Sequence, residues 1–274
     1  MNKRTPAARR ARFRALHESG FFIIPNPWDI GSAKWLAGAG FKALASTSSG
    51  FAFSRGQPDG GVGVDDVLAH LTELVNATDL PVNADFENGH ARDHDALADN
   101  VRRCVATGVA GLSIEDRDNE ADHALYPCDE AVARVRVTRD AIDATGADVM
   151  LIGRAECFLA GCPDLDEVLR RLTAYAEAGA DCLYAPGLST REQIGAVVEA
   201  VAPKPVNVLM GPAAALTIEE LAGLGVRRVS TGGALALNAW SGFVQAAEPL
   251  AAGRFDGFNA NVSRDSLGRL FDPG

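Results

Sequence analysis

The sequence predicts a single (β/α)8 TIM barrel, an α/β fold in which parallel strands alternate with helices. The chain has 274 residues, which suits one large barrel and is short for two independent domains. It contains eight short apolar segments with strand character, and amphipathic segments with helical spacing separate them. A doubly wound open sheet is the alternative, but no G-x-G-x-x-G phosphate motif follows the first strand.

The strands are predicted from the residues that precede them. Five follow a glycine suited to ending a helix in the left-handed conformation, at Gly40, Gly108, Gly146, Gly179 and Gly225. Two others follow a proline, which stops a helix and begins an extended segment. In chain order the predicted strands lie within residues 21–25, 40–46, 82–87, 108–116, 146–154, 179–186, 206–210 and 225–233.

Helices are predicted between the strands from apolar residues three or four positions apart. Two capping boxes, Thr190 with Gln193 and Thr217 with Glu220, each mark the start of a helix. The basic segment 1–18 is interpreted as a helix that caps the domain, because it lacks the apolar core of a secretory signal. The apolar stripes are Leu68, Leu71 and Val75; Leu97, Val101, Cys104 and Val105; and Leu165, Val168, Leu169, Leu172 and Tyr175.

Composition excludes several classes of protein. The chain has 26 Lys and Arg against 36 Asp and Glu, and the formal charge of −10 argues against a nucleic-acid partner. No apolar run approaches the roughly 20 residues of a membrane span. The five cysteines are odd in number and include no C-x-x-C pair, so we expect reduced thiols in a cytoplasmic protein.

Acidic residues follow the predicted strands at the end where barrel enzymes carry their active sites. The candidates for one cluster are four acids, Asp59, Asp85, Glu87 and Glu115. Converging carboxylates repel one another unless a cation joins them or some take up protons. A Mg²⁺ ion held by one or two carboxylates and several waters would satisfy them. The alternative is that Asp85 and Glu115 cap the following helices or pair with Arg154 or Arg92, and spacing alone favours neither reading.

Other strand ends offer groups that bind anions. Thr47, Ser48 and Ser49 present hydroxyls and backbone N–H groups that can hold an oxyanion such as an enolate oxygen. A Ser/Thr-rich turn is the commoner interpretation of such a motif when it stands alone. Arg154 ends its strand, and a guanidinium in a barrel mouth usually needs an anionic partner.

Four further residues complete the candidate site. Trp28 and Asn207 lie at strand ends and are candidates for substrate binding. His90 and His123 lie in loops and are either general acids or solvated histidines.

In their order and spacing these residues resemble the phosphoenolpyruvate mutase/isocitrate lyase superfamily, from about residue 20 to about residue 240. The family's third-strand motif D-x-D-x-G-Y-G is matched by DFENGHA at residues 85–91. Its I-E-D motif is present at residues 114–116, and its fifth-strand arginine is matched by Arg154. Its S-G-L-type loop corresponds to residues 47–49, and Asp59 follows Thr47 by the family's interval of twelve residues.

The resemblance implies chemistry assisted by Mg²⁺, or by Mn²⁺, on a small 2-oxo acid through a pyruvate-like enolate. Asp85 is expected to bind the metal directly, with Glu87, Glu115 and Asp59 holding its waters. The metal and the loop at residues 47–49 would bind the oxo-carboxylate end of the substrate.

The catalytic residues expected from this resemblance and from the strand ends are Arg154, Glu115 and His123. Arg154 would neutralise the substrate carboxylate or the charge that develops on it. Members of the superfamily cleave C–C bonds or rearrange and hydrolyse P–C bonds. The resemblance also implies a homo-oligomer, a tetramer or a dimer, whose subunits exchange a C-terminal helix. Here residues 233–274 would be the helical extension, with 233–252 as the exchanged helix.

The chain departs from the family pattern in several places. The K-[KR]-C-G-H lid of isocitrate and methylisocitrate lyases is absent, and the loop after Glu115 reads DRDNEADHALYPCDE. Arg117 stands in place of a common lysine, Glu87 in place of an aspartate, and Gly-His-Ala in place of G-Y-G. These changes argue against methylisocitrate cleavage and leave the substrate open.

Three functions follow from this reading. The leading hypothesis is a Mg²⁺-dependent lyase that cleaves a C–C bond of a small 2-hydroxy or 2-oxo dicarboxylate, by retro-aldol cleavage or decarboxylation. The second is a P–C mutase or hydrolase of the phosphonopyruvate type. The third is a barrel that binds a metabolite without catalysis, which the missing lid cysteine favours.

Overall fold

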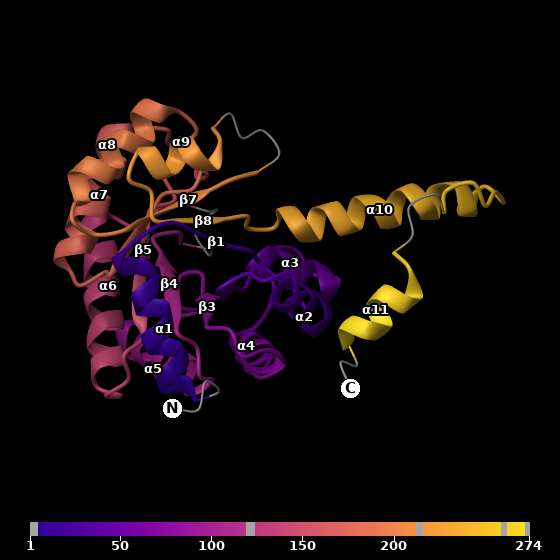
Figure 1. The fold of residues 1–274 in the computed structure, drawn as a ribbon. Helices are drawn as coiled ribbons and strands as arrows, with labels where there is room; N and C mark the ends of the chain where they lie inside the picture. The colour runs from indigo at the N-terminus through magenta and orange to yellow at the C-terminus, as the bar shows by residue number, and fades with distance from the viewer. Residues whose placement is uncertain (1–4, 119–123, 212–215, 259–261, 272–274) are drawn as a thin grey trace.

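The structure, a computed structural model, describes residues 5–118, 124–211, 216–258 and 262–271. Eight parallel strands form one sheet in the order β1-β8-β7-β6-β5-β4-β3-β2. The two end strands of this order are joined by a hydrogen bond from Ala45 N to Pro25 O at 3.1 Å. The sheet is therefore a nearly closed barrel (Figure 1), as predicted, and the strand order excludes the doubly wound alternative.

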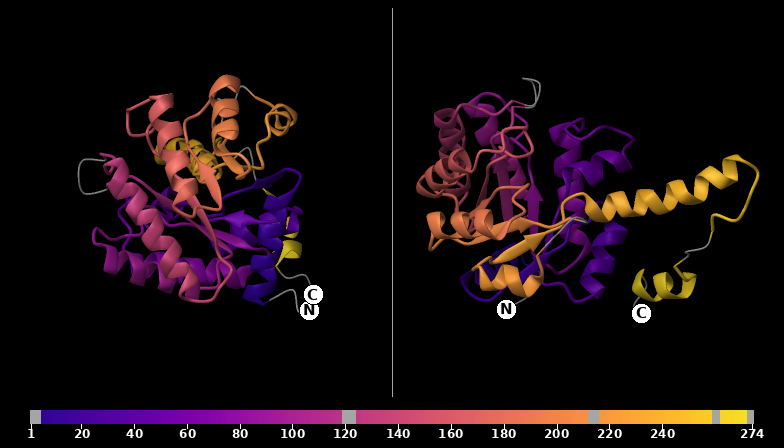
Figure 2. Two further views of the ribbon diagram at one scale, coloured as in Figure 1. Left: turned by 90° about the vertical axis from the view of Figure 1, so that its left-hand side faces the viewer. Right: turned by 90° about the horizontal axis from the view of Figure 1, so that it is seen from above.

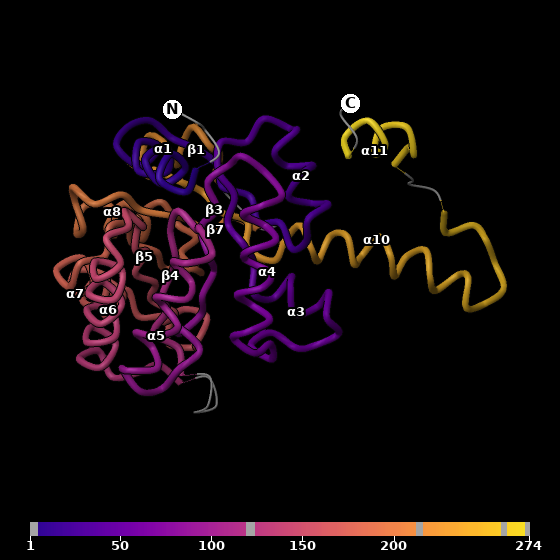
Figure 3. The backbone as a smooth tube through the Cα atoms, turned by 90° about the horizontal axis from the view of Figure 1, so that it is seen from below, coloured from indigo at the N-terminus to yellow at the C-terminus, as the bar shows by residue number. Residues whose placement is uncertain are grey.

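Each predicted strand segment contains one strand of the barrel. The strands are β1 (Phe22–Ile24), β2 (Leu44–Ala45), β3 (Val82–Asp85), β4 (Gly111–Glu115), β5 (Met150–Arg154), β6 (Cys182–Tyr184), β7 (Val206–Leu209) and β8 (Arg228–Ser230). The helices that surround them are α1 (Pro6–Glu18), α2 (Ile30–Gly38), α3 (Ser48–Ser54), α4 (Val64–Ala77), α5 (His94–Ala106), α6 (Cys128–Asp143), α7 (Leu165–Glu177), α8 (Arg191–Val201), α9 (Ile218–Gly223), α10 (Ala234–Ala251) and α11 (Arg264–Phe271). Figure 3 shows α5 to α8 gathered on one side of the strands and α2 to α4 on the other.

The local signals in the sequence have the predicted structural meaning. All five junction glycines adopt a positive φ, from 69° at Gly146 to 108° at Gly179, and each precedes a strand. A side chain in that backbone conformation is strained, so glycine suits these helix ends. Thr190 and Thr217 both form complete capping boxes. The three predicted apolar stripes lie on the packed faces of α4, α5 and α7.

Helix α1 lies across the amino ends of the strands. Arg10 donates to Val109 O and Arg14 pairs with Asp148, which lie just before β4 and β5, and Arg9 donates to Val75 O in the last turn of α4. Phe13 is fully buried and packs against the barrel interior, where a Cβ on Gly111 would approach Phe13 Cε1 to 2.7 Å. The lower end of the barrel is therefore filled by protein.

Helix α10 leaves the barrel after β8 and projects away from it, and α11 returns to pack against α2 (Figures 1 and 2). Large apolar side chains on α10 are exposed, including Leu237, Trp240 and Phe243, the last with 62% of its surface accessible. None of the helices in the described ranges is long and apolar enough to cross a membrane.

Candidate active site

Two adjoining cavities open at the carboxyl ends of the strands, where barrel enzymes bind their substrates. The inner cavity, of about 180 Å³, is lined mainly by strand and strand-end side chains, among them Asn26, Asn83, Ser113, Tyr184, Asn207 and Ser230. The outer cavity, of about 550 Å³, is lined by loop residues and strand ends, among them Pro58, Gly60, Glu87, Glu115 and Arg117. Ser48, Asp59 and Arg154 line both cavities, so the two form one site.

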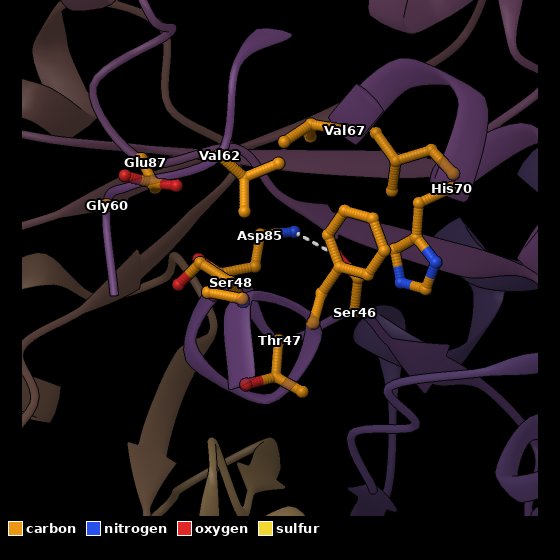
Figure 4. Close-up of a pocket in the computed structure, with 12 residues that line it drawn as sticks. Ser46, Thr47, Ser48, Gly60, Val62, Val67, His70, Asp85 and Glu87 are labelled. Carbon is orange, nitrogen blue, oxygen red and sulfur yellow. Dashed lines mark hydrogen bonds between the residues drawn. The ribbon is translucent and has the colours of Figure 1, made fainter. Parts of the chain in front are cut away.

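Asp85 is at the centre of this site. It ends β3, and its backbone N–H donates to Ser46 Oγ at 2.8 Å. Its Oδ2 accepts a hydrogen bond from the Ser48 backbone N–H at 2.9 Å, and its Oδ1 lies 3.1 Å from Arg154 Nη1. Figure 4 shows Asp85 and Ser48 side by side, with Glu87 and Gly60 beyond them. The carboxylate is thus fixed by two neighbouring elements before any ligand binds.

Arg154 joins three carboxylates in one ion-pair network. Its Nη1 lies 3.0 Å from Glu115 Oε2 in addition to its contact with Asp85, and its Nε donates to Glu156 Oε1. The Tyr184 ring lies against the guanidinium, with 5.2 Å between Cζ and the ring centroid. Burial by itself lowers the pKa of Arg154, but the charges of Glu115 and Glu156 outweigh it and raise this pKa well above its usual value.

The single positive charge of Arg154 is too small to neutralise the three carboxylates around it. Burial raises the pKa of Glu115 well above its usual value, although Arg154 opposes the shift. Burial also raises the pKa of Glu156, whose Oε2 is buried and has no hydrogen-bond partner among the described residues. The predicted alternative for Asp85 and Glu115 is therefore correct in one respect, since both pair with Arg154. Neither caps a helix, and Arg92 pairs with Asp118 instead.

Asp59 and Glu87 bring two further carboxylates to the outer cavity. Burial and the nearby charge of Asp85 raise the pKa of Asp59, and a hydrogen bond with the Ser48 side chain opposes the shift. Glu87 is buried and holds a left-handed backbone with φ of 47°, a conformation that costs a non-glycine residue free energy. The four acids predicted to form one cluster thus line a common space, in which Arg154 and Arg117 also lie.

This donor set fits a magnesium ion with few direct protein ligands. Among the residues that the structure describes, no three His, Cys, Asp or Glu side chains are close enough together to enclose a metal. Mg²⁺ does not need such a group, because it binds through one or two carboxylates and keeps several waters. Burial and the charge of Asp85 both raise the pKa of Asp59, and a divalent cation beside the two carboxylates would oppose that shift.

The loop at residues 47–49 begins α3 and lies against this carboxylate. Thr47 caps α3 by accepting from Gly50 N at 3.2 Å, so the interpretation as a Ser/Thr turn is also correct. Thr47 Oγ1 and Ser49 Oγ are 3.2 Å apart. A Cβ at Gly233 would approach Ser49 Oγ to 2.7 Å, so the start of α10 touches this loop directly. All three residues of the loop line the inner cavity.

The remaining predicted site residues have different surroundings. Asn207 lines the inner cavity and donates to Ser230 Oγ at 3.0 Å. Trp28 lies with Trp240 and Phe243 at the base of α10, and it is not among the residues that line the inner or outer cavity. His90 is half-buried, and desolvation lowers its pKa. His123 lies outside the described residues.

Glu156, Tyr184 and Arg228 are among the residues of the site that were not predicted as functional. Glu156 and Tyr184 follow or end strands and could have been selected by the same rule that selected Arg154. Arg228 lies within a strand, where a charged side chain in an apolar run was the available signal. Because strand side chains alternate between faces, Arg227 and Arg228 could not be told apart without the register.

Comparison with known proteins assigns the chain to one family. Residues 13–251 match the sequence profile of the family Phosphoenolpyruvate phosphomutase. An uncharacterised protein of Mycobacterium tuberculosis is 32% identical over 222 residues, which are 80% of this chain and 81% of the relative.

Solved structures of relatives cover nearly the whole chain. A Burkholderia cenocepacia protein named provisionally as a lyase/mutase is 46% identical, with a TM-score of 0.93 and 97% of each chain covered. A 2,3-dimethylmalate lyase is 26% identical, with a TM-score of 0.84, 97% of this chain and 94% of that chain. Other matches include a 2-methylisocitrate lyase of Escherichia coli, an oxaloacetate decarboxylase of Rhodopseudomonas palustris, an oxaloacetate acetylhydrolase bound to oxalate, and a Burkholderia cenocepacia protein named provisionally as a phosphonomutase. These relatives include C–C lyases, a hydrolase and mutases.

Proposed function

The chain belongs to the phosphoenolpyruvate mutase/isocitrate lyase superfamily, and on that premise we propose that it is a Mg²⁺-dependent lyase that cleaves a C–C bond of a small 2-hydroxy or 2-oxo dicarboxylate. The observation that carries this proposal is the position of Asp85, whose two oxygens contact Arg154 Nη1 and Ser48 N. The carboxylate that would bind the metal, a guanidinium and a backbone donor therefore meet at one cavity.

In this proposal the described acids have separate roles in binding the metal. Asp85 would hold the metal, with Asp59, Glu87 and Glu115 accepting hydrogen bonds from its waters. When bound, Mg²⁺ would supply positive charge to the oxo or hydroxy oxygen and the adjacent carboxylate of the substrate. Mn²⁺ has the same ligand preference and could replace it.

Groups that are already in place would stabilise the negative charge that develops during cleavage. Arg154 is held by three carboxylates and a tyrosine ring, so it needs no rearrangement when negative charge forms beside it. Residues 47–49 line the same cavity, and their hydroxyls are candidates to bind the developing oxyanion. Glu115 and His123 remain our candidates for proton transfer, Glu115 because its pKa is raised.

The size of the inner cavity supports a small substrate. A water molecule in the liquid occupies about 30 Å³, so about 180 Å³ corresponds to roughly six waters. That space suits an acid of four or five carbons. Most of the residues that line it are polar, which agrees with a substrate that is charged at both ends.

The proposal is tested by following pyruvate release from oxaloacetate, 2-methylmalate and 2,3-dimethylmalate with Mg²⁺ or with EDTA. We expect turnover of at least one substrate that EDTA removes and added Mg²⁺ restores. Asp85→Asn, which keeps the shape of the side chain, should lower kcat/KM at least 100-fold. Turnover that is insensitive to EDTA, or wild-type rates in Asp85→Asn, would contradict the proposal.

A second candidate is P–C bond chemistry on a phosphonate. The match to the phosphoenolpyruvate phosphomutase profile and the relative named provisionally as a phosphonomutase favour it. Phosphorus NMR of phosphonopyruvate incubated with the enzyme and Mg²⁺ separates the two. Conversion of the phosphonate signal would select this candidate, and an unchanged signal would favour the C–C lyase.

We further propose that the enzyme is a cytoplasmic homo-oligomer, a tetramer or a dimer, in which α10 packs on a neighbouring subunit. Leu237, Trp240 and Phe243 expose a continuous apolar face on a helix that leaves its own barrel. Light scattering of wild type and Phe243→Ser tests this, and a monomeric wild type would contradict it. The five free thiols in the structure agree with a reducing compartment.

A further inference from the structure

A second arginine, Arg228, lies inside the barrel and reaches the inner cavity from β8. It is 3% exposed and lines the cavity together with Asn207 and Tyr184. Its Nε donates to Asn207 Oδ1 at 2.8 Å, and its Nη1 lies 3.4 Å from His17 Nε2. These residues belong to a row of strand partners that runs from Arg154 through Tyr184 and Asn207 to Arg228.

Arg228 forms no ion pair with any residue in the described ranges, whereas Arg154 forms three. His17 does not supply a negative charge, because its Nδ1 donates to Phe13 O and its ring is neutral, with a pKa lowered to about 3 by burial and by Arg228. A guanidinium keeps its proton in a protein, and a buried unpaired charge is costly. The arrangement is therefore incomplete without an anion.

The inner cavity has two walls of opposite character. Its acids, Asp59 and Asp85, lie on the side of the loop at residues 47–49 and β3. The wall formed by β6, β7 and β8 has no acid among its described lining residues, and it presents Tyr184, Asn207, Arg228 and Ser230. We call the side with the acids the first wall and the side formed by β6, β7 and β8 the second wall. A ligand that binds a cation at the first wall and presents a carboxylate to the second wall would complement the charge of both walls.

We propose that Arg228 and Asn207 bind the far carboxylate of the substrate, and that the reaction is retro-aldol cleavage of a 2-hydroxy dicarboxylate rather than decarboxylation. This inference rests on the proposed function, because it names the substrate class and the reaction of the same cavity. Asn207 is oriented for the role, since its Oδ1 accepts from Arg228 and its amide N–H groups face Ser230 and the cavity.

The charge that moves in each reaction decides between them. In retro-aldol cleavage, a base removes the proton of the C2 hydroxyl, C2–O becomes a carbonyl, and the C2–C3 bond breaks with its electron pair on C3. That pair delocalises into the far carboxylate until C3 takes up a proton, so the products are a 2-oxo acid and a saturated carboxylic acid. The far carboxylate gains negative charge on the way, and Arg228 would bind this state more tightly than the substrate.

Decarboxylation moves charge in the opposite direction. The carboxylate that leaves as CO2 gives its electron pair to the neighbouring carbon and loses its charge. A guanidinium that holds this carboxylate stabilises the substrate more than the transition state, and it therefore slows the reaction. An unpaired arginine at the far end of the cavity thus favours cleavage between C2 and C3.

The experiment compares Arg228→Met with Arg227→Met in the full-length enzyme with Mg²⁺. Arg227 is the matched control, because it directly precedes Arg228 and β8 but donates to Gly20 O outside the cavities. Pyruvate release is measured from 2-methylmalate and 2,3-dimethylmalate, and from oxaloacetate as the decarboxylation substrate. We expect Arg228→Met to lower kcat/KM for the 2-hydroxy acids 100- to 1000-fold and to raise the ratio of decarboxylation to cleavage, with both unchanged in Arg227→Met.

A binding measurement keeps this inference separate from the proposed function. Oxalate, which is too short to span the cavity, and 2-methylmalate are titrated by calorimetry with Mg²⁺ present. We expect Arg228→Met to weaken 2-methylmalate at least tenfold more than oxalate. Equal weakening of both ligands, or an unchanged ratio of the two reactions, would overturn the role of Arg228. Failure of oxalate to bind wild type with Mg²⁺ would instead contradict the proposed function.

Discussion

Two arginines face the inner cavity, and the charges that surround them differ. Arg154 is surrounded by Asp85, Glu115 and Glu156, which together more than neutralise it. Arg228 is more deeply enclosed by the barrel, but its recorded partners, Asn207 and His17, are neutral. The charges of Glu115 and Glu156 raise the pKa of Arg154, whereas burial lowers that of Arg228. The comparison shows two uses of arginine in one barrel. Arg154 holds the acids of the protein in place, whereas Arg228 is left to pair with the negative charge of a ligand.

The largest effect should come from removing Arg154. Arg154→Met leaves buried carboxylates without their shared cation, and breaking a buried ion pair in this way costs about 3–5 kcal/mol. We expect the free energy of unfolding in urea to fall by that amount and activity to fall below detection. Arg228→Met breaks no ion pair and should lose much less stability. Equal losses at the two positions would show that the two arginines do not differ as described.

Placing an acid on the second wall should remove the difference between the walls. Asn207→Asp puts a carboxylate where Arg228 Nε now donates at 2.8 Å, so the guanidinium gains an internal partner. We expect kcat/KM for a 2-hydroxy dicarboxylate to fall roughly 100-fold, with a thermal midpoint at or above that of wild type. Asn207→Ala leaves Arg228 unpaired and should lose less activity. A larger loss in the alanine variant would contradict the internal ion pair.

A smaller effect is expected at the contact between Ser48 and Asp85. Ser48 is the first residue of α3, a position that tolerates proline, and Thr47 before it is already extended. Ser48→Pro removes the N–H that donates to Asp85 Oδ2 without breaking the helix. Because one hydrogen bond to a charged group contributes about 1.5–3 kcal/mol, we expect roughly a tenfold or greater loss in kcat/KM. Ser48→Ala keeps the N–H and serves as the control in the same steady-state assay.

The smallest effect concerns acid stability at the base of the second wall. Burial lowers the pKa of His17 to about 3, so below about pH 6.5 the unfolded chain binds a proton that the folded chain excludes. Stability from this residue is complete above pH 6.5 and is lost as the pH falls toward 3, by about 2 kcal/mol at pH 5. His17→Phe should lack this part of the loss between pH 7 and pH 5 in urea unfolding. An identical pH dependence in the two proteins would show that His17 is protonated in the folded state.

The barrel could be predicted because each of its signals is local. The glycine at each of five junctions and the two capping boxes depend on backbone conformation over a few residues, and all have the expected geometry. The acids of the first wall could also be predicted, because the carboxyl ends of parallel strands meet at one end of a barrel.

The second wall could not be predicted for reasons that are equally physical. Which of Arg227 and Arg228 points inward depends on register, and a shift of one residue reverses the two. Trp28 lies in the loop after β1, as predicted, but it lies with Trp240 and Phe243 at the base of α10. The partners of Arg154 depend on contacts between strands, and a single sequence does not say whether Asp85 and Glu115 bind an arginine, a metal or both.

The position of α1 has a consequence for the order of events in the barrel. Phe13 and His17 are buried at the lower end, so among the described residues the barrel is filled there and the chamber opens at the mouth. A product fragment seated against Arg228 can then depart only after whatever lies between it and the mouth has gone. The release of the two products would be sequential, and the deeper fragment would be the last to leave and the stronger inhibitor of the next turnover.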